Sequence, residues 1–293
     1  MTLFIREQQM SSPHTNEISH VSDTALMVAA CRAAETERED AFVRDPFAAQ
    51  LAGERGSSIL GAMPHAQIMR FGLAVRTHFI DELLQETLAA NPISVVLSVG
   101  CGLDTRPWRL DLPPHLRWIE VDFQDMLDYK HRLMADEKPR CHIERFALDL
   151  NDHTLRQRMY EAAGSARTLM ITEGLLLYLP ATTVEALTSE SWQRAGVRHW
   201  ISDITTSAFN IALTGASTLQ SISHVQDSDA LRGEEILAVF HRNGWTTGSS
   251  RSYITDLGFA QDRIRKMMQG GTPPPKPIPP DDPTGVHCFA RAS

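Results

Sequence analysis

Hydrophobic positions along this chain change their spacing near residue 91. Before it, apolar side chains recur at helical spacing and no segment is typical of a strand, as in Phe79, Ile80, Leu83, Leu84 and Leu88. After it, short runs rich in β-branched residues alternate with longer amphipathic segments. This alternation predicts an α/β domain in which a parallel sheet carries helices on both faces.

The second part of the chain contains seven predicted strands and four predicted helices. The strands are expected at residues 95–99, 118–122, 142–150, 168–172, 199–204, 245–254 and 286–290. The helices are expected at residues 125–135, 155–163, 184–194 and 234–243. The last helix stops before Gly244, a residue type that favours a helix C-terminus.

These patterns divide the chain into two parts. We expect an N-terminal helical cap over residues 1–90, whose polar first 20 residues are flexible, and a ligand-binding domain over residues 91–293. Residues 205–232 are long, rich in Ser and Thr, and follow the fifth strand. An insertion there would lie over the carboxyl edge of the sheet, so we expect it to cap a substrate pocket.

A tight glycine turn follows the first predicted strand. Gly100 and Gly102 let the backbone turn sharply and approach a ligand closely. A dinucleotide fingerprint would need a third glycine, and this chain has Thr105 there. Asp104 would repel a pyrophosphate, which binds at backbone N–H groups, but it suits a cofactor with sulfonium and ammonium charges, such as S-adenosylmethionine. The alternative for Asp104 is a helix N-cap in an ordinary strand–turn–helix unit.

Acidic residues also end the next three predicted strands. Asp122 follows Asp104 by eighteen positions, where a carboxylate typically accepts hydrogen bonds from a ribose diol. Asp149, with Leu150 beside it, suits the exocyclic amine of an adenine ring, and Glu173 ends the fourth strand. Ligands in open α/β sheets bind at the carboxyl edge of the strands. Four acids in series at that edge therefore predict one binding site.

Four motifs together resemble the leucine carboxyl methyltransferase family, whose bacterial branch includes polyketide O-methyltransferases. They are GCGLDTR at residues 100–106, WIEVDF at 118–123, the DL pair at 149–150 and TEGLLLYLP at 172–180. The resemblance extends from about residue 20 to at least 185. It implies a class I, Rossmann-like methyltransferase fold with a seven-stranded sheet, and S-adenosyl-L-methionine as the cofactor.

The resemblance also implies roles for individual residues. Arg76 would bind the cofactor carboxylate, Gly100 would line the turn, and Glu173 would lie beside the methionine end. The ribose and adenine would be bound by Asp122 and by Asp149 with Leu150. One position departs from the family's protein-phosphatase methylating branch, because Cys31 stands before Arg32 where that branch has lysine. A peptide carboxylate would therefore not be held in the same manner.

Bulk properties restrict the remaining possibilities. A formal net charge of −8 argues against a nucleic-acid partner, which needs a basic surface. The four cysteines lack C-x-x-C spacing and the twelve histidines lack a ligand pattern, so we expect no metal. Residues 1–20 have no apolar core of a signal peptide, and no apolar run would span a bilayer. We expect a cytoplasmic protein with no membrane partner; its oligomeric state is left open.

Two surface segments need a separate interpretation. The basic run at residues 263–266 is typical of a solvated helix face. The proline-rich stretch at residues 273–280 fits a stiff connector better than a ligand for a proline-binding domain.

Methyl transfer asks little of side chains beyond holding the reactants in line. A carboxylate acceptor needs no base, whereas a phenol with a pKa of about 10 benefits from one. Tyr178 follows the fourth strand and could orient the acceptor oxygen as a catalytic residue, or pack its ring on the cofactor. His78 and His224 have no motif around them. The sequence thus predicts an O-methyltransferase for a hydroxyl or carboxyl oxygen of a small, polyketide-like molecule; the alternatives are a protein carboxyl methyltransferase or a catalytically silent cofactor-binding protein.

Overall fold

The computed structural model describes residues 20–63, 66–194, 196–214, 226–270 and 276–291. One sheet of seven strands forms its centre, in the order β3-β2-β1-β4-β5-β7-β6. The strands are β1 (Val95–Val99), β2 (Arg117–Asp122), β3 (His142–Ala147), β4 (Thr168–Thr172), β5 (Val197–Ile204), β6 (Trp245–Ser252) and β7 (Gly285–Arg291). All seven predicted strands are therefore present, and the order is that of class I methyltransferase folds.

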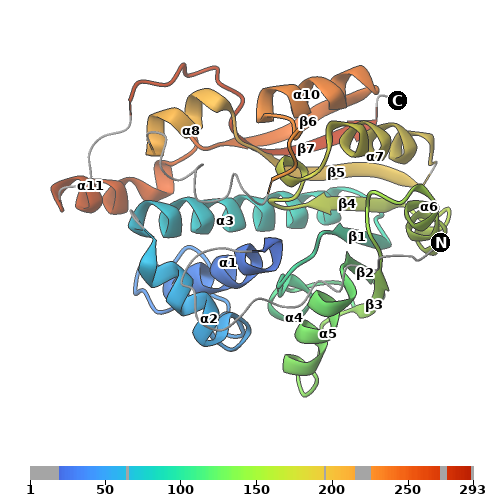
Figure 1. Cartoon of the computed structure of the whole chain (residues 1–293), viewed down its shortest axis with the longest axis horizontal. Coiled ribbons are helices and arrows are strands. Elements are labelled where there is room, and N and C mark those ends of the chain that lie inside the picture. The colour runs from blue at the N-terminus through green and yellow to red at the C-terminus, as the bar shows by residue number, and fades with distance from the viewer. Residues whose placement is uncertain (1–19, 64–65, 195, 215–225, 271–275, 292–293) are drawn as a thin grey trace, which may run out of the picture.

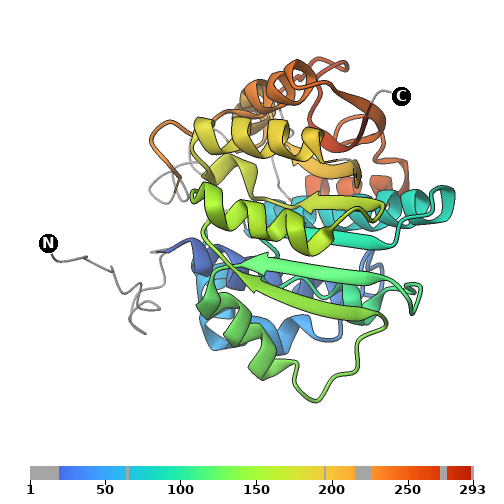
Figure 2. The same ribbon diagram turned by 90° about the vertical axis from the view of Figure 1, so that its right-hand side faces the viewer.

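Strand direction decides which residues share an edge. Strands β1 to β5 are parallel, with Val95 opposite Arg117 on one side and Thr168 on the other. The expectation of a parallel sheet is wrong for β7, which runs antiparallel to both β5 and β6. Because β7 lies between them, β6 points the same way as β5. The carboxyl ends of six strands consequently meet at one edge, and in Figure 2 the arrowheads of the green strands β2 and β3 point toward the side on which α1 lies.

Helices cover both faces of the sheet because the strand side chains alternate. Val95, Leu97 and Val99 pack into one cluster with α6 (His153–Ala163), α7 (Ala181–Gln193) and α10 (Gly233–Arg242). Val96 points to the opposite face, where it packs with Phe79 and Ile80 of α3 (Ala66–Ala90). Figure 1 shows α3 running along the sheet beneath β4, with α7 and α10 above β5. The predicted two-sided burial is confirmed.

The N-terminal region is helical, as predicted. It consists of α1 (Val21–Thr36), α2 (Ala48–Ala62) and α3. Helix α1 begins at a reciprocal cap in which His20 accepts a hydrogen bond from a backbone N–H and the Asp23 carboxylate accepts one from the His20 N–H. Figure 1 places α1 and α2 together below α3. Within the cap, α3 covers one face of the sheet, and α1 contacts the glycine turn through Arg32, which donates to the carbonyl oxygen of Leu103. The division at residue 90 stays a prediction, as does the flexible start, which lies outside the described residues.

The remaining helices occupy the connections. They are α4 (Arg106–Arg109), α5 (Gln124–Leu133), η1 (Leu176–Tyr178), α8 (Ser207–Thr214), η3 (Gly258–Ala260) and α11 (Gln261–Gln269). Of the predicted insertion at residues 205–232, the structure describes residues 205–214, which include α8, and residues 226–232. Residues 273–275 of the proline-rich stretch at 273–280 lie outside the described part.

Two expectations from the sequence need correction. Strand β3 ends at Ala147, so Asp149 stands in the turn that precedes the Asp152 cap of α6 and not at a strand end. Arg263 on α11 is buried, whereas the basic run was expected to be solvated. Its guanidinium donates to Glu35 at 2.7 Å and lies 3.7 Å from the centre of the Phe42 ring. Only Arg265 and Lys266 of this run are exposed, and Arg263 instead joins α11 to the N-terminal cap.

Candidate functional site

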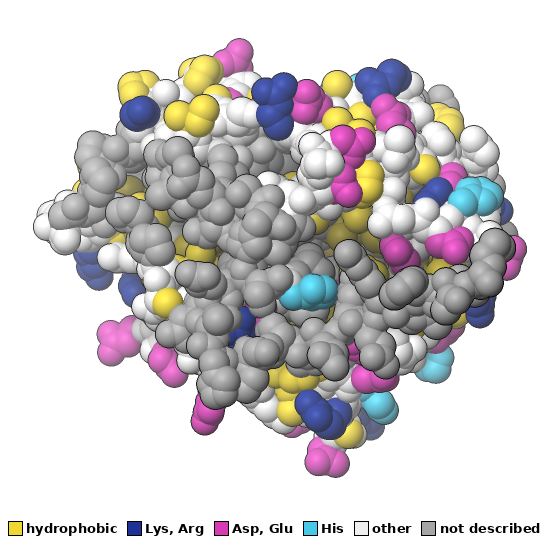
Figure 3. Space-filling model, viewed as in Figure 1, with side chains coloured by type: hydrophobic (Ala, Val, Ile, Leu, Met, Phe, Trp, Pro, Cys, Tyr) yellow, Lys and Arg dark blue, Asp and Glu magenta, His cyan; other side chains and the backbone are white. Residues whose placement is uncertain are grey.

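A cavity of about 1350 Å³ opens at the carboxyl edge of the sheet. This volume exceeds the roughly 300–1,000 Å³ typical of a site for one drug-sized ligand, so there is room for two ligands. Its wall includes most of the predicted site residues: Arg76, Gly100, Gly102, Asp104, Asp122, Glu173 and Tyr178. Figure 3 shows hydrophobic side chains at the bottom of a hollow on the face seen in Figure 1.

The glycine turn forms one side of the cavity. Gly100 has a φ of +63°, and a Cβ at that position would lie 2.6 Å from Leu175 Cδ1. Gly102, with a φ of +45°, donates its N–H to Asp122 Oδ2 at 2.7 Å. The Asp122 carboxylate also accepts the Phe123 N–H at 2.7 Å. The end of β2 thus holds the turn in place, and both glycines are needed for its shape.

Asp104 closes the same turn. Its Oδ1 accepts the backbone N–H of Arg106 at 3.0 Å, and its Oδ2 lies 3.1 Å from the Arg106 guanidinium. The N-cap of α4 is Thr105, so the cap interpretation is wrong by one residue, although the Asp104 carboxylate does accept the first N–H of the helix. It also lines the cavity, so its charge faces any ligand bound there.

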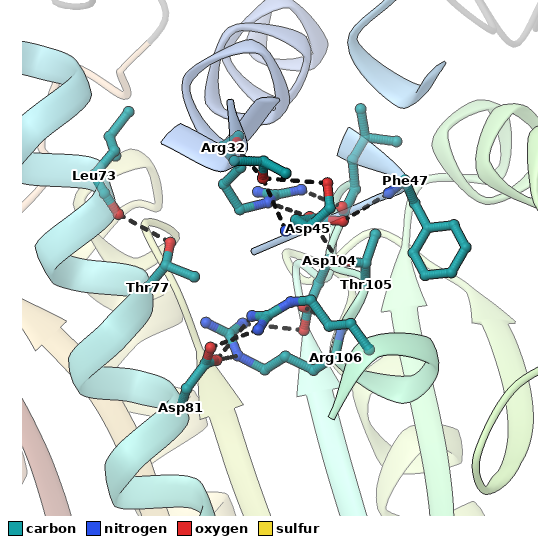
Figure 4. A network of polar contacts seen from close by, with 12 residues as sticks. Arg32, Asp45, Phe47, Leu73, Thr77, Asp81, Asp104, Thr105 and Arg106 are labelled. Carbon is teal, nitrogen blue, oxygen red and sulfur yellow. Dashed lines mark hydrogen bonds and ion pairs between the residues drawn. The ribbon is translucent and has the colours of Figure 1, made fainter. Parts of the chain in front are cut away.

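Arg106 connects the turn to helix α3 and to the segment after β4. Its Nε donates to Asp81 on α3 at 2.6 Å, and its Nη1 donates to Glu173 after β4 at 2.7 Å. Arg109 makes a two-pronged contact with the same Asp81 carboxylate, at 2.6 and 2.8 Å. Figure 4 shows the Arg106 side chain extending toward Asp81, which lies on helix α3. A two-pronged contact between a guanidinium and a carboxylate fixes the relative orientation of the two groups in addition to pairing their charges.

Glu173 is the centre of the ionic network. Its two oxygens accept from Arg106 and from Arg76 Nε, the latter at 3.0 Å. Burial by itself would raise the pKa of Glu173, but the guanidinium groups of Arg106 and Arg76 outweigh it and hold the pKa well below its usual range. The carboxylate consequently stays ionised throughout the physiological range.

The sequence did not single out Asp203, which completes this network. It lies near the end of β5, accepts the Gly174 N–H at 2.7 Å and pairs with Arg76 Nη1 at 3.5 Å. Burial raises the pKa of its carboxyl group, against the lowering effect of Arg76. The rule that placed acids at strand ends could have found it, because Asp203 is the only acid in the predicted fifth strand.

A second pair holds the N-terminal cap to the turn. Arg32 on α1 donates to Asp45 at 2.9 Å and to the carbonyl oxygen of Leu103 at 2.6 Å. Thr105 donates its hydroxyl to the same Asp45 carboxylate at 2.7 Å (Figure 4). The cap therefore contacts the cavity wall through buried polar bonds.

Two predicted site residues do not reach the cavity wall. Asp149 is exposed and accepts the Asn151 N–H at 2.9 Å, and Leu150 is buried in the core. Their predicted contact with adenine stays a prediction. Tyr178 does line the cavity, and its hydroxyl is hydrogen-bonded to Thr24 of α1.

The two ends of the cavity differ in chemistry. We call the part lined by Arg76, the glycine turn, Asp104, Asp122, Glu173 and Asp203 the polar end. The apolar end comes from α3, α8, α11 and the loops beside them: Phe71, Phe209, Leu231, Leu257, Ile264 and Met267. Figure 1 shows α8 and α11 at the same end of the molecule as the start of α3.

Cys101 and the possible metal ligands are further candidates for chemistry at the site. Cys101 lies in the turn, and burial raises the pKa of its thiol well above the usual range, so it is a small packed residue and not a reactive thiolate. Within the described ranges, no group of three or more His, Cys, Asp or Glu side chains could hold a metal ion. The helices in those ranges are all too short or too polar to cross a membrane.

Comparisons with known proteins agree with this geometry. Residues 25–191 match the family model named leucine carboxyl methyltransferase. A protein of Streptomyces avermitilis named "putative S-adenosyl-L-methionine-dependent methyltransferase" is 37% identical over 182 residues, which are 58% of this chain and 63% of that protein. A Mycobacterium tuberculosis protein of the same name is 35% identical over 184 residues, 57% of this chain and 60% of its own length. The chain therefore covers less than two thirds of these relatives.

Solved structures show the same fold. A "putative methyltransferase" from Thermobifida fusca superposes with a TM-score of 0.55 at 15% identity, over 95% of this chain and 96% of that one. A DUF574 family protein from Streptomyces avermitilis reaches a TM-score of 0.59 at 11% identity, over 90% of this chain and 97% of that one.

Proposed function

Because the chain belongs to the leucine carboxyl methyltransferase family, we propose that it is an S-adenosyl-L-methionine-dependent O-methyltransferase. The acceptor is an oxygen of a small, largely apolar molecule, of which a polyketide-like metabolite is one example. The observation that carries the proposal is the acidic lining of the polar end beside a tight glycine turn. Four carboxylates, those of Asp104, Asp122, Glu173 and Asp203, line it.

The polar end fits the charges of the cofactor. S-adenosyl-L-methionine carries a sulfonium, an ammonium and a carboxylate, so its positive charges outnumber its negative charge. Beside these four carboxylates, the polar end has the guanidinium group of Arg76, and the Arg32 guanidinium that also lines the cavity is already paired with Asp45. Elsewhere on the wall, Arg232 and Asp227 add one charge of each sign. Nearby opposite charge stabilises a cation more strongly in a partly buried site than in water. A pyrophosphate would meet repulsion in the same place.

Individual residues then take the following roles. The Asp122 carboxylate binds the ribose, Arg76 binds the cofactor carboxylate, and Glu173 orients Arg76. Gly100 keeps the wall free of a side chain where the cofactor passes. Asp149 and Leu150 hold the adenine in this scheme, which requires the loop after β3 to lie against the bound ring.

The bound cofactor supplies an electrophilic methyl carbon on a sulfonium leaving group. The chain's own contribution is to hold the acceptor oxygen in line with it, and this alignment accounts for much of the rate enhancement. Burial raises the pKa of Tyr178, so its hydroxyl stays protonated near neutral pH. Tyr178 therefore orients the acceptor as a hydrogen-bonding group and is not a general base.

A methyl-transfer assay tests the proposal. The full chain is incubated with S-adenosyl-L-[methyl-³H]methionine and a panel of hydroxylated and carboxylated apolar compounds, and solvent-extractable label is measured. We expect label in at least one compound and none with Asp122→Ala. Label that enters only peptides ending in a free carboxylate would favour protein carboxyl methylation instead, and failure to bind the cofactor would refute the proposal.

A further inference from the structure

The hydroxyl groups of the chain's four tyrosines differ in their hydrogen bonding. Tyr129 donates to the carbonyl oxygen of Leu51 at 2.9 Å, and Tyr160 donates to that of Leu187 at 3.3 Å. Tyr178 is bonded to Thr24. The hydroxyl oxygen of Tyr253 is buried and has no hydrogen-bond partner within the described part of the protein. A buried polar group without a partner is costly, so its retention points to a partner that arrives from outside.

Tyr253 stands directly after β6, at the carboxyl edge of the sheet. Because β6 is parallel to β5, this position shares an edge with Asp203 and Glu173. Tyr253 also lines the cavity, together with Phe209, Ile254 and Leu257 of the apolar end. The Tyr253 side chain therefore forms part of the wall between the polar and apolar ends.

Packing holds the Tyr253 ring in one orientation. The ring stacks on Phe79 with centroids 6.0 Å apart, and the Phe209 ring lies at 5.9 Å. Its backbone N–H donates to the carbonyl oxygen of Thr284 at 3.1 Å. A hydroxyl on a fixed ring is preorganised to meet a ligand, which lowers the entropic cost of binding.

The charges around Tyr253 decide what kind of group it can bind. Burial raises the pKa of its hydroxyl well above the usual range, the Asp203 carboxylate raises it further, and Arg76 lowers it. The hydroxyl is therefore protonated at neutral pH and acts as a hydrogen-bond donor. The carboxylates of Asp203 and Glu173 and the guanidinium of Arg76 all interact with this hydroxyl. In the proposed function the charge of Arg76 is already matched by the cofactor carboxylate, so a second carboxylate, that of an acceptor, would be repelled there.

We propose that Tyr253 is an acceptor-binding residue, whose hydroxyl donates a hydrogen bond to the oxygen of a neutral, hydroxyl-bearing apolar substrate. This inference rests on the proposed function for the location of the acceptor, and it goes further by selecting a hydroxyl over a carboxylate. The apolar end binds the body of the substrate, and Tyr253 binds its oxygen at the boundary with the polar end.

A matched pair of ligands tests the selection. Calorimetric titrations of the full chain, with S-adenosylhomocysteine present, compare 1-naphthol with 1-naphthoate at pH 7. We expect naphthol to bind at least about 10-fold more tightly than naphthoate, and Tyr253→Phe to weaken naphthol binding about 10-fold, the effect of one hydrogen bond. Equal binding of the two ligands, no binding of naphthol by the parent protein, or unchanged binding by the variant would each overturn the inference.

Two controls separate this role from a structural one. Tyr253→Phe removes an unpartnered buried group, so the melting temperature of the free protein should stay the same or rise, whereas Tyr160→Phe loses a made bond and should lower it without changing naphthol binding. A lower melting temperature for Tyr253→Phe would identify a structural hydroxyl and contradict the inference. The affinity for S-adenosylhomocysteine alone should be the same in Tyr253→Phe and in the parent protein. If S-adenosylhomocysteine does not bind even to the parent protein, that result counts against the proposed function, separately from the inference.

Discussion

The polar and apolar ends of the cavity are built in different ways. The polar end is a network in which Glu173 joins Arg76 and Arg106. Its carboxylates lie at or near the ends of strands, and Arg76 reaches them from helix α3. The apolar end collects side chains from three helices that are far apart in sequence, and packing is its main attraction. Arg263 on α11, next to the lining residue Ile264, adds ion pairs with buried Glu35 and with Asp40. Charge and hydrogen-bond geometry tolerate few substitutions, whereas apolar packing tolerates many volume-conserving ones.

The largest expected effect concerns the carboxylate that holds the glycine turn. Asp122→Ala removes the group that accepts the Gly102 N–H and that we expect to bind the ribose, so S-adenosylmethionine affinity should fall more than about 100-fold, the combined loss of two or more charge-assisted hydrogen bonds. Calorimetric titration measures this.

Asp149→Ala is the matched control at an exposed position. We expect it to reduce the affinity less than about 10-fold, since its side chain contributes at most one hydrogen bond to the ligand. Full cofactor affinity in Asp122→Ala would show that the polar end has been misassigned.

Glu173→Gln should destabilise the protein strongly, because it removes one negative charge from two buried guanidinium groups, leaving Arg76 with Asp203 and Arg106 with Asp81 and Asp104. Breaking a buried ion pair costs about 3–5 kcal/mol of unfolding free energy. Glu144→Gln removes a half-exposed partner of Arg117 and should cost about 1 kcal/mol or less. Urea unfolding of both variants measures the difference; equal losses would show that the network adds no stability beyond a surface pair.

The lowered pKa of Glu173 predicts how the stability of the protein depends on pH. The pKa of Glu173 is lower in the folded protein than in the unfolded chain, so its contribution is fully present above a pH of about 4.3, the ordinary value for the unfolded chain. It is lost as the pH falls toward the lowered pKa. Acid unfolding followed by circular dichroism should therefore be less steep in Glu173→Gln than in the parent protein.

Arg263→Ala tests whether the stability of the apolar end affects cofactor binding at the polar end. It removes the guanidinium that joins α11 to Glu35 and the Phe42 ring, so we expect a loss of about 3 kcal/mol in unfolding free energy. Arg265→Ala on the same helix, which breaks only an exposed pair with Asp262, should change stability by less than about 1 kcal/mol. Cofactor affinity should be unchanged in both variants; a loss in Arg263→Ala would mean that the two ends are coupled.

The smallest expected effect tests the charge at the turn. Asp104→Asn keeps the oxygen that accepts the Arg106 N–H but removes one negative charge from the cavity wall. We expect affinity for S-adenosylmethionine to fall about 5-fold relative to S-adenosylhomocysteine, since only the former carries the sulfonium charge and Coulomb energies in such sites are of order 1 kcal/mol or more. An unchanged ratio of the two affinities would show that Asp104 serves α4 alone.

The polar end could be predicted from the sequence because its residues follow strands in short motifs. Gly100, Asp122 and Glu173 each sit within a few residues of a buried strand, and parallel strands bring their ends together. Asp203 and Tyr253 obey the same rule at the fifth and sixth strands but lack a family motif. Reading the sheet edge through to its last strands would have identified both.

The apolar end could not be predicted in the same way. Ile264 and Phe209 are ordinary apolar residues on amphipathic helices, and only the fold brings α11 and α8 to one cavity. Arg263 shows the same limit, because a basic run is usually solvated and nothing local signals that Glu35 lies opposite. The end of β3 was misplaced by three residues, since the sequence continues with hydrophobic Leu148 and Leu150 after the strand has ended.

The central claim is that the polar end binds a cationic adenosyl cofactor and not a dinucleotide. Parallel calorimetric titrations of the full chain with S-adenosylmethionine and with NAD⁺ test it most directly. We predict saturable one-to-one binding of S-adenosylmethionine and no detectable heat of binding with NAD⁺. Binding of NAD⁺, or no binding of S-adenosylmethionine, would contradict the account.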